Sequence, residues 1–196
     1  MARPRSTEAR DAAVEATVCL LVEQGVEGVT FEAVAGRSGV AKSTLYRHFG
    51  TRGSMICAAG SSCFVDIPTP DTGSLREDLR ILVDRMHEAE EQRRLPDVMP
   101  SLLAAASTDP EIGTLVDSLL AERRRPLRTV LQLAQLRGEI GRDLDLDDVC
   151  TLFIGPLIAR RMVDRREISD EYRSLVLETV LAGLLATAPD PADASG

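Results

Sequence analysis

A cluster of hydrogen-bond donors occupies residues 42–48 of this 196-residue chain, in the sequence KSTLYRH. The polar members of the cluster are Lys42, Ser43, Thr44, Tyr46, Arg47 and His48. Side chains of these types can donate to phosphate oxygens and to the edges of bases. The cluster therefore indicates contact with nucleic acid, although the polar face of a helix in many all-α proteins meets only solvent.

The elements that hold the donor cluster follow from the apolar residues around it. Apolar side chains recur at i, i+3 and i+4 from Phe31, which predicts a short helix with one buried face. Gly39 interrupts this pattern, as a turn with an unusual backbone angle requires. Leu45 and Phe49 stand four residues apart and give a second helix its buried edge. Two short helices joined by a glycine turn predict a helix-turn-helix, whose second helix enters the major groove of DNA.

The stretch AVAGRSGVAKSTLYRHFGTR, residues 33–52, resembles the DNA-binding signature of the TetR family of transcriptional regulators. Thr30 also matches the residue that precedes this signature. The resemblance implies a homodimeric repressor that binds a palindromic operator in double-stranded DNA. Pairing is expected on physical grounds as well, because one three-helix module buries only about 600–1,000 Å² on DNA and two modules reinforce each other.

The expected DNA contacts differ by side chain. Contacts with base edges and the neighbouring sugar-phosphate are predicted for Lys42, Ser43, Thr44 and Tyr46. Contacts with phosphate are predicted for Thr30, Arg37, His48 and Arg52, and Arg47 lies on the same donor face. The family commonly has a lysine at the position of Arg52, and arginine keeps the charge and can bind phosphate bidentately. Gly53 and Gly60 depart from helix-favouring residues, and each should weaken the next helix by roughly 1 kcal/mol.

The net charge of −8 does not exclude a DNA-binding function. Residues 1–56 contain seven Lys or Arg and six Asp or Glu, a net charge of +1, so the rest of the chain carries −9. All six acids precede Gly39, whereas four of the seven bases lie at or beyond Arg37. Because the placement of charge matters more than its sum, only the N-terminal part is expected to bind nucleic acid.

The composition predicts an all-α fold of about nine helices, because aromatic residues make up only 3% of the chain and runs of β-branched residues are nearly absent. We expect a three-helix helix-turn-helix DNA-binding domain over 1–52, a helical effector-binding and dimerisation domain over 53–188, and a disordered tail over 189–196. Beyond the helix-turn-helix, helices are expected at about 52–65, 75–94, 102–107, 110–136, 146–163 and 170–186. The prolines of LPDVMPS, residues 95–101, predict a break.

The most apolar helical stretches are LFIGPLIARRMV and LVLETVLAGLLA, near the C-terminus. Their apolar surface is too wide for lone surface helices, and either a core or a subunit interface would explain it. The resemblance implies the interface, in which two such helices from each subunit form a four-helix arrangement. The residues expected at this dimer interface are Leu152, Phe153, Pro156, Leu157, Leu175, Val176, Val180 and Leu184.

The resemblance further implies a small-molecule effector that binds among the middle helices and shifts the helix beginning near Arg52. Candidates for the lining of its pocket are Cys63, Phe64, Met86, His87, Met99, Phe153 and Met162. Met and Phe at helical spacing are more often part of a plain core. The apolar character of the set suggests a hydrophobic effector.

Other classes of function find little support in the sequence. The chain has only two histidines and lacks GxSxG, HExxH and P-loop patterns, so we expect no catalytic site, no metal site and no cofactor. The cysteines form no CxxC pair, which favours free thiols, with a redox sensor as the alternative; they are Cys19, Cys57, Cys63 and Cys150.

The expected location is cytoplasmic. No apolar run approaches the ~20 residues of a membrane span, and no hydrophobic segment follows the basic residues of the N-terminus. The alternative function is a helix-turn-helix scaffold that acts as a ligand-blind DNA binder or as a protein-interaction module.

Overall fold

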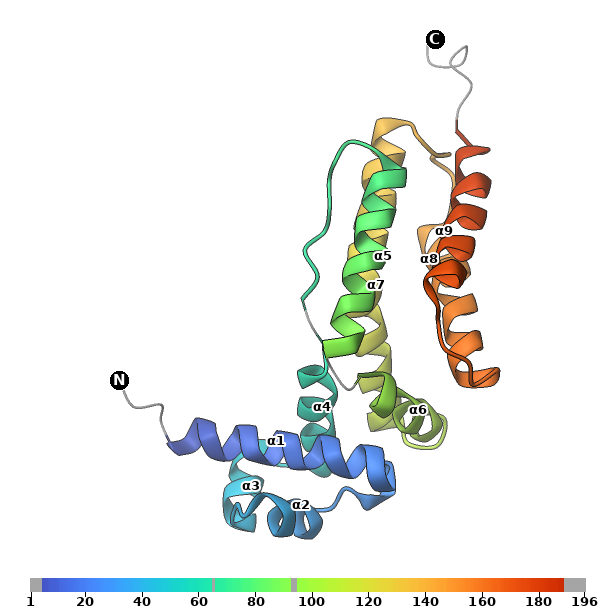
Figure 1. Ribbon diagram of the computed structural model, residues 1–196. Coiled ribbons are helices and arrows are strands. Elements are labelled where there is room, and N and C mark those ends of the chain that lie inside the picture. Colours follow the sequence, from blue (N-terminus) through green and yellow to red (C-terminus); the bar gives the residue numbers. More distant parts are fainter. Residues whose placement is uncertain (1–4, 65, 93–94, 189–196) are drawn as a thin grey trace. The chain divides into compact units, whose positions relative to one another are not determined.

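The computed structural model describes residues 5–64, 66–92 and 95–188, and every element within these ranges is a helix (Figure 1). The all-α prediction is therefore confirmed for the part of the chain that the structure describes. The fold divides into two compact units. The N-terminal unit comprises residues up to Asp66 together with Ala89–Ala121, and the C-terminal unit comprises Ile67–Glu88 together with the residues from Glu122 onward.

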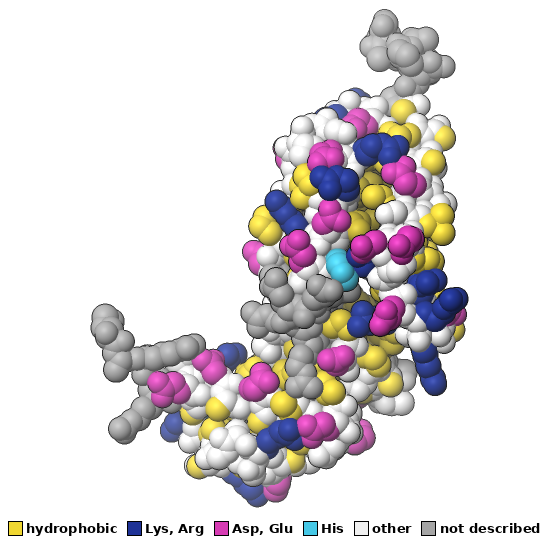
Figure 2. Space-filling model, in the orientation of Figure 1, with side chains coloured by type: hydrophobic (Ala, Val, Ile, Leu, Met, Phe, Trp, Pro, Cys, Tyr) yellow, Lys and Arg dark blue, Asp and Glu magenta, His cyan; other side chains and the backbone are white. Residues whose placement is uncertain are grey.

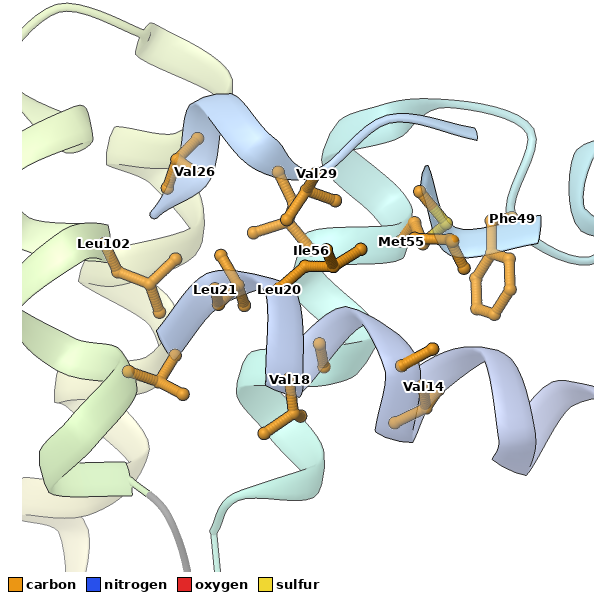
Figure 3. Close-up of a cluster of buried hydrophobic side chains, with 14 of the residues drawn as sticks. Val14, Val18, Leu20, Leu21, Val26, Val29, Phe49, Met55, Ile56 and Leu102 are labelled. Atoms are coloured by element: carbon orange, nitrogen blue, oxygen red, sulfur yellow. The ribbon is translucent and has the colours of Figure 1, made fainter. Parts of the chain in front are cut away.

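The N-terminal unit contains the predicted helix-turn-helix. Its helices are α1 (Arg5–Gln24), the 3-10 turn η1 (Val26–Gly28), α2 (Phe31–Ser38), α3 (Lys42–Phe49), α4 (Arg52–Ser62), α6 (Leu95–Ala106) and the first part of α7 (Pro110–Arg137). Helix α1 lies across α2 and α3 (Figure 1). Fully buried side chains such as Leu21, Leu45 and Ile56 fill the space between these helices. Figure 3 shows part of this core, with side chains that belong to α1, η1, α4 and α6.

Local sequence signals fix both ends of α2 and the start of α4. The Thr30 hydroxyl accepts a hydrogen bond from the Ala33 amide at 3.0 Å and caps α2. Gly39 ends α2 in the left-handed region at φ 71°, where glycine carries no steric penalty. Thr51 caps α4 in the same way, accepting from the Ser54 amide at 3.0 Å. The turn between α2 and α3 therefore begins at a glycine, whereas side-chain caps start α2 and α4.

The two glycines of α4 lie where α7 approaches closely. A Cβ added at Gly53 would lie 2.0 Å from the carboxyl carbon of Glu111, and one at Gly60 would lie 3.0 Å from a methyl of Leu119. The Glu111 carboxylate also accepts a hydrogen bond from the Thr51 hydroxyl at 3.1 Å. Both glycines thus leave room for side chains of α7. Helix α4 ends at Ser62, earlier than predicted, and Val65 lies outside the described residues.

The predicted break at residues 95–101 is wrong, because α6 begins at Leu95 and runs through the whole segment to Ala106. Pro96 stands in the first turn, where backbone N–H groups have no partner within the helix and a proline removes nothing. Pro100 lies inside the helix on its exposed side, where the missing N–H costs one hydrogen bond. Helix α7 likewise continues through Pro126.

The C-terminal unit holds the second core. It comprises the first part of α5 (Leu75–Gln92), the remainder of α7, α8 (Leu146–Ile158), the π-helical turn η2 (Ala159–Val163) and α9 (Asp170–Leu185). The buried carboxylate of Asp78 accepts from the Thr72 amide at 2.6 Å and from Arg137 at 3.1 Å. Arg137 also pairs with Glu139, which accepts from the Leu75 amide. This polar network ties the start of α5 to the end of α7.

Candidate nucleic-acid interface

Helix α3 presents the predicted donor face while two side chains hold it in the core. Leu45 is fully buried and Phe49 almost so, which anchors one edge of the helix. Most donors of the other edge are exposed: Lys42, Ser43, Tyr46 and Arg47. Thr44 and His48 are half-buried. An eight-residue helix fixed along one edge, with its donors outward, has the form that a major groove of about 12 Å admits.

Tyr46 is held by an aromatic stack that the sequence analysis did not predict. Its ring lies over that of Phe31, with the ring centroids 3.9 Å apart and the planes 18° from parallel. Phe31 is buried as the first residue of α2, whereas Tyr46 is 52% exposed. The stack therefore fixes the orientation of an exposed phenol on α3. Aromatic residues at both positions were the signal for it, but the turn geometry was needed to bring them together.

Arg37 and Lys42 each pair with a glutamate of the same unit. The Arg37 guanidinium donates to both carboxylate oxygens of Glu23, on α1, at 2.6 Å each. The Lys42 ammonium pairs with the carboxylate of Glu32, on α2. These hydrogen bonds raise the pKa of Arg37 and lower the pKa of Glu32, because they favour the charged form of each group. Both pairs lie at the surface and join neighbouring elements.

Arg52 makes structural contacts rather than facing only solvent. Its Nε donates to the carbonyl of Val29 at 2.8 Å and its Nη2 donates to the carbonyl of Val26 at 2.5 Å. The carboxylate of Glu27 lies 4.0 Å from the same Nη2. The first residue of α4 is thereby tied to the segment that precedes α2. The predicted phosphate contact of Arg52 remains a prediction, and this structural tie was not foreseen.

His48 is placed less favourably for a phosphate than expected. Its Nε2 is buried and has no hydrogen-bond partner among the described residues. The imidazole lies against the neighbouring Phe49 ring, with centroids 6.2 Å apart. A contact between Nε2 and DNA would need the side chain to turn, so the predicted role of His48 stays a prediction. Thr30, the last predicted phosphate contact, is exposed at the start of α2.

The comparisons with known proteins agree with this geometry. Residues 13–59 match the family model described as bacterial regulatory proteins, tetR family, and residues 69–180 match the Tetracyclin repressor-like C-terminal domain. The chain belongs to the TetR family of transcriptional regulators. Within this family, α2 and α3 form the DNA-binding helix-turn-helix. Residues 60–68 lie between the two matched segments.

Several relatives cover nearly the whole length of this TetR-family regulator. The DNA-binding transcriptional repressor TetR of Mycobacteroides abscessus is 31% identical over 186 residues, which cover 91% of this chain and 95% of that protein. The HTH-type transcriptional regulator YdeS of Bacillus subtilis is 26% identical over 187 residues, 94% of each chain. Relatives of this kind are transcriptional regulators, which are generally not enzymes.

Two solved structures share the fold. The TetR family transcription regulator SCO0332 superposes with a TM-score of 0.67 at 26% identity, over 90% of this chain and 98% of that one. The flavonoid-responsive regulator FrrA superposes with a TM-score of 0.72 over 92% and 96% of the two chains. Its identity is 20%, so this second likeness concerns the fold alone.

The residues predicted to line an effector pocket fall into both units of the regulator. Cys63, Phe64 and Met99 pack with the core of the N-terminal unit. Phe153 is buried in the core of the C-terminal unit, and Met86 packs against that core. His87 and Met162 are half-buried. Most of the set therefore contributes to the two cores, as Met and Phe at helical spacing commonly do, and the pocket assignment remains a prediction.

The residues predicted at the dimer interface also divide by exposure. Phe153, Val176 and Leu184 are buried within the subunit itself. Leu152 and Leu175 are exposed to 65% and 61%, although leucine is usually buried. Pro156, Leu157 and Val180 are intermediate. Figure 2 shows hydrophobic side chains reaching the surface over α8 and α9, so these helices offer an apolar face in addition to filling a core.

Helices long and apolar enough to cross a membrane do not occur in the described ranges. Nor do the residues of those ranges bring together three or more histidine, cysteine or carboxylate side chains in an arrangement that could hold a metal ion.

Proposed function

We propose that this TetR-family regulator is a homodimeric repressor that binds a palindromic operator through α3 and is released by a small hydrophobic effector. The observation that carries the proposal is the donor face of α3, which the buried Leu45 and Phe49 hold outward. Repression is supported by the 31% identical relative from Mycobacteroides abscessus, which is named as a DNA-binding transcriptional repressor.

The proposal divides the work of α3 between bases and backbone. Lys42, at the start of the helix, is proposed to reach base edges and the adjacent sugar-phosphate, as are Ser43, Thr44 and Tyr46. The stack on Phe31 supports a defined position for Tyr46, because a restrained ring loses less rotational freedom on binding. Arg47, exposed on the same helix, is proposed to meet the phosphates, together with Thr30, Arg37 and Arg52.

Dimerisation is proposed to use the apolar side of α8 and α9. Two copies related by a two-fold axis would bury Leu152 and Leu175, whose exposure in a single subunit costs hydrophobic free energy. Two recognition helices would then read two half-sites of one operator. The effector, bound in the C-terminal part, must favour one state of the dimer, and a shift from 1:99 to 99:1 requires about 5.5 kcal/mol of difference in binding.

The first experiment is selection of bound duplexes from a random DNA library at fixed physiological salt. Enrichment of a palindrome with two-fold related half-sites is the expected result. General, salt-sensitive binding without enrichment would contradict sequence reading and favour a protein-interaction module. A thermal-shift screen against metabolites and drugs then tests the effector, because a ligand of the folded state raises the melting temperature. Stabilisation by none of them would favour a ligand-blind DNA binder.

The role of Lys42 has its own test. Replacing Lys42 with Ala should weaken operator binding and lower the slope of log affinity against log salt by about 0.9, because one phosphate-type contact is lost. Arg142, exposed on the loop before α8, provides a matched control, since Arg142→Ala removes the same charge from the C-terminal unit. Unchanged affinity of Lys42→Ala across a salt titration would remove Lys42 from the interface.

A further inference from the structure

The acids and bases that are segregated in the N-terminal sequence are paired in the folded unit. Three of the predicted DNA-binding cations each face a glutamate that precedes Gly39 in the chain. The pairs are Arg37 with Glu23, Lys42 with Glu32, and Arg52 with Glu27. On the surface proposed to meet DNA phosphates, glutamate carboxylates therefore lie next to the cations.

The three pairs differ in how firmly the cation is held. Arg37 makes two hydrogen bonds to Glu23, and Arg52 makes two to backbone carbonyls of the segment before α2. Lys42, in contrast, contacts only the Glu32 carboxylate among the described residues, and both side chains are at least half exposed. Exposed ion pairs contribute little to stability, so this one can exchange its partner easily.

The position of the exchangeable pair is at the start of the recognition helix. Lys42 is the first residue of α3 and Glu32 is the second residue of α2, so their pair bridges the two helices across the turn. A lysine ammonium has three donors, and a single carboxylate does not use all of them. Lys42 can therefore keep Glu32 and still donate to an acceptor that α3 brings to a fixed place.

We propose that Glu32 determines specificity by holding Lys42 in place and competing with DNA phosphates for its charge. On DNA without the operator sequence, binding rests almost entirely on phosphate contacts, and a cation neutralised by a carboxylate contributes little. On the operator, base contacts fix α3, and Lys42 donates to its acceptor from its place beside Glu32. Glu32 thus weakens general binding more than operator binding. This inference rests on the proposed contact between Lys42 and DNA.

The test compares the selected operator with a scrambled duplex of the same length over a salt series. Glu32→Gln should tighten binding to the scrambled duplex by roughly five- to tenfold at 0.1 M salt and steepen its salt slope by about 0.9. Operator affinity should change by less than about threefold, so the ratio of the two affinities falls. Asp117→Asn is the matched control, because Asp117 is exposed on α7 of the same unit and the charge change is equal. It should leave the ratio unchanged.

The double variant separates the action of Glu32 through Lys42 from simple repulsion of DNA. If Glu32 acts through Lys42, adding Glu32→Gln to Lys42→Ala should bring little further gain on the scrambled duplex. An undiminished gain would overturn this mechanism, as would an equal tightening on both duplexes by Glu32→Gln alone.

The outcomes also distinguish this inference from the proposed function beneath it. If Lys42→Ala binds both duplexes like the wild type, the DNA contact of Lys42 is wrong and the role of Glu32 fails with it. If Lys42→Ala weakens binding while Glu32→Gln leaves the scrambled duplex unchanged, only the role of Glu32 is wrong. Circular dichroism melts of each variant establish that the affinities are those of folded protein.

Discussion

Helix α3 in the N-terminal unit and helix α9 in the C-terminal unit use the same anchoring principle and expose opposite chemistry. Leu45 and Phe49 bury one edge of α3, and Leu177 and Leu181 bury one edge of α9. The free side of α3 carries hydrogen-bond donors, whereas α9 exposes Leu175. The buried edge fixes each helix in its unit, and in the proposed function the exposed side decides whether the partner is a polyanion or another apolar surface.

The comparison also explains why the net charge of this chain says little about its partner. The cations of the N-terminal unit that are proposed to meet DNA are largely balanced by its own glutamates. Specific recognition needs donors in defined places, and an excess of positive charge mainly increases general affinity for DNA. An acidic protein can therefore read DNA if its recognition helix is correctly placed.

The largest expected effect comes from placing a charge on the apolar side of α9. Leu175→Asp should weaken dimerisation by at least about a hundredfold, because an unpaired carboxylate in an apolar interface costs several kcal/mol. Operator affinity should fall with it, since a monomer reads one half-site. Sedimentation velocity gives the oligomeric state. Leu136→Asp is the control, since Leu136 is 78% exposed on α7 of the same unit and outside the predicted interface. If Leu175→Asp remains dimeric, the exposed side of α9 is not the dimer interface.

A smaller effect is expected where α4 meets α7 in the N-terminal unit. The methyl group of Gly53→Ala would occupy the place of the Glu111 carboxylate, which can turn away but then loses its hydrogen bond from Thr51. The free energy of unfolding should fall by about 1 kcal/mol. In a Glu111→Ala background the same change should be neutral or stabilising, because alanine favours a helix. A double-mutant cycle in urea measures this, and strict additivity would contradict the close approach.

An effect confined to alkaline pH concerns the buried thiol of the second core, Cys150. Burial, and next the charge of Asp147, raise the pKa of Cys150 from 9.0 to about 11. The unfolded state then releases this proton first, so stability falls as the pH rises above about 9. The stability gap between wild type and Cys150→Ala should narrow over pH 9–11, by at most about 1.4 kcal/mol per pH unit. Urea midpoints at pH 8 and 10.5 test this, and a constant gap would argue against a protonated native thiol.

Alkylation compares the accessibility of a thiol in each unit. Native Cys150 is fully buried, whereas Cys19 in the N-terminal unit is half exposed, so iodoacetamide at pH 9 should label Cys19 first. Mass spectrometry of the labelled protein identifies the order. Early labelling of Cys150 would mean that the second core opens readily in the native protein.

The features that could be predicted from the sequence are those that depend on neighbouring residues. Thr30, Asp109 and Ser169 cap α2, α7 and α9, and such caps can be predicted because a cap needs only the next turn of its own helix. The donor side of α3 followed from the spacing of Leu45 and Phe49. The family itself was evident from residues 33–52 and is confirmed.

The features that could not be predicted depend on the turns that bring distant residues together. Glu23 and Arg37 are fourteen residues apart and meet only because α1 lies against α2. Thr51 and Glu111 are sixty residues apart, so the reason for a glycine at position 53 was invisible in the sequence. The first part of the helix at 95–106 was missed because proline was taken as a breaker without regard to its position in the turn.

The tie made by Arg52 has a mechanical consequence. Its guanidinium joins the first residue of α4 to the carbonyls of Val26 and Val29, directly before the cap of α2. Two hydrogen bonds at this joint oppose sliding of α4 past the base of the helix-turn-helix. We therefore expect a displacement of the first turn of α4 to move the start of α2 as well, and the recognition helix α3 with it.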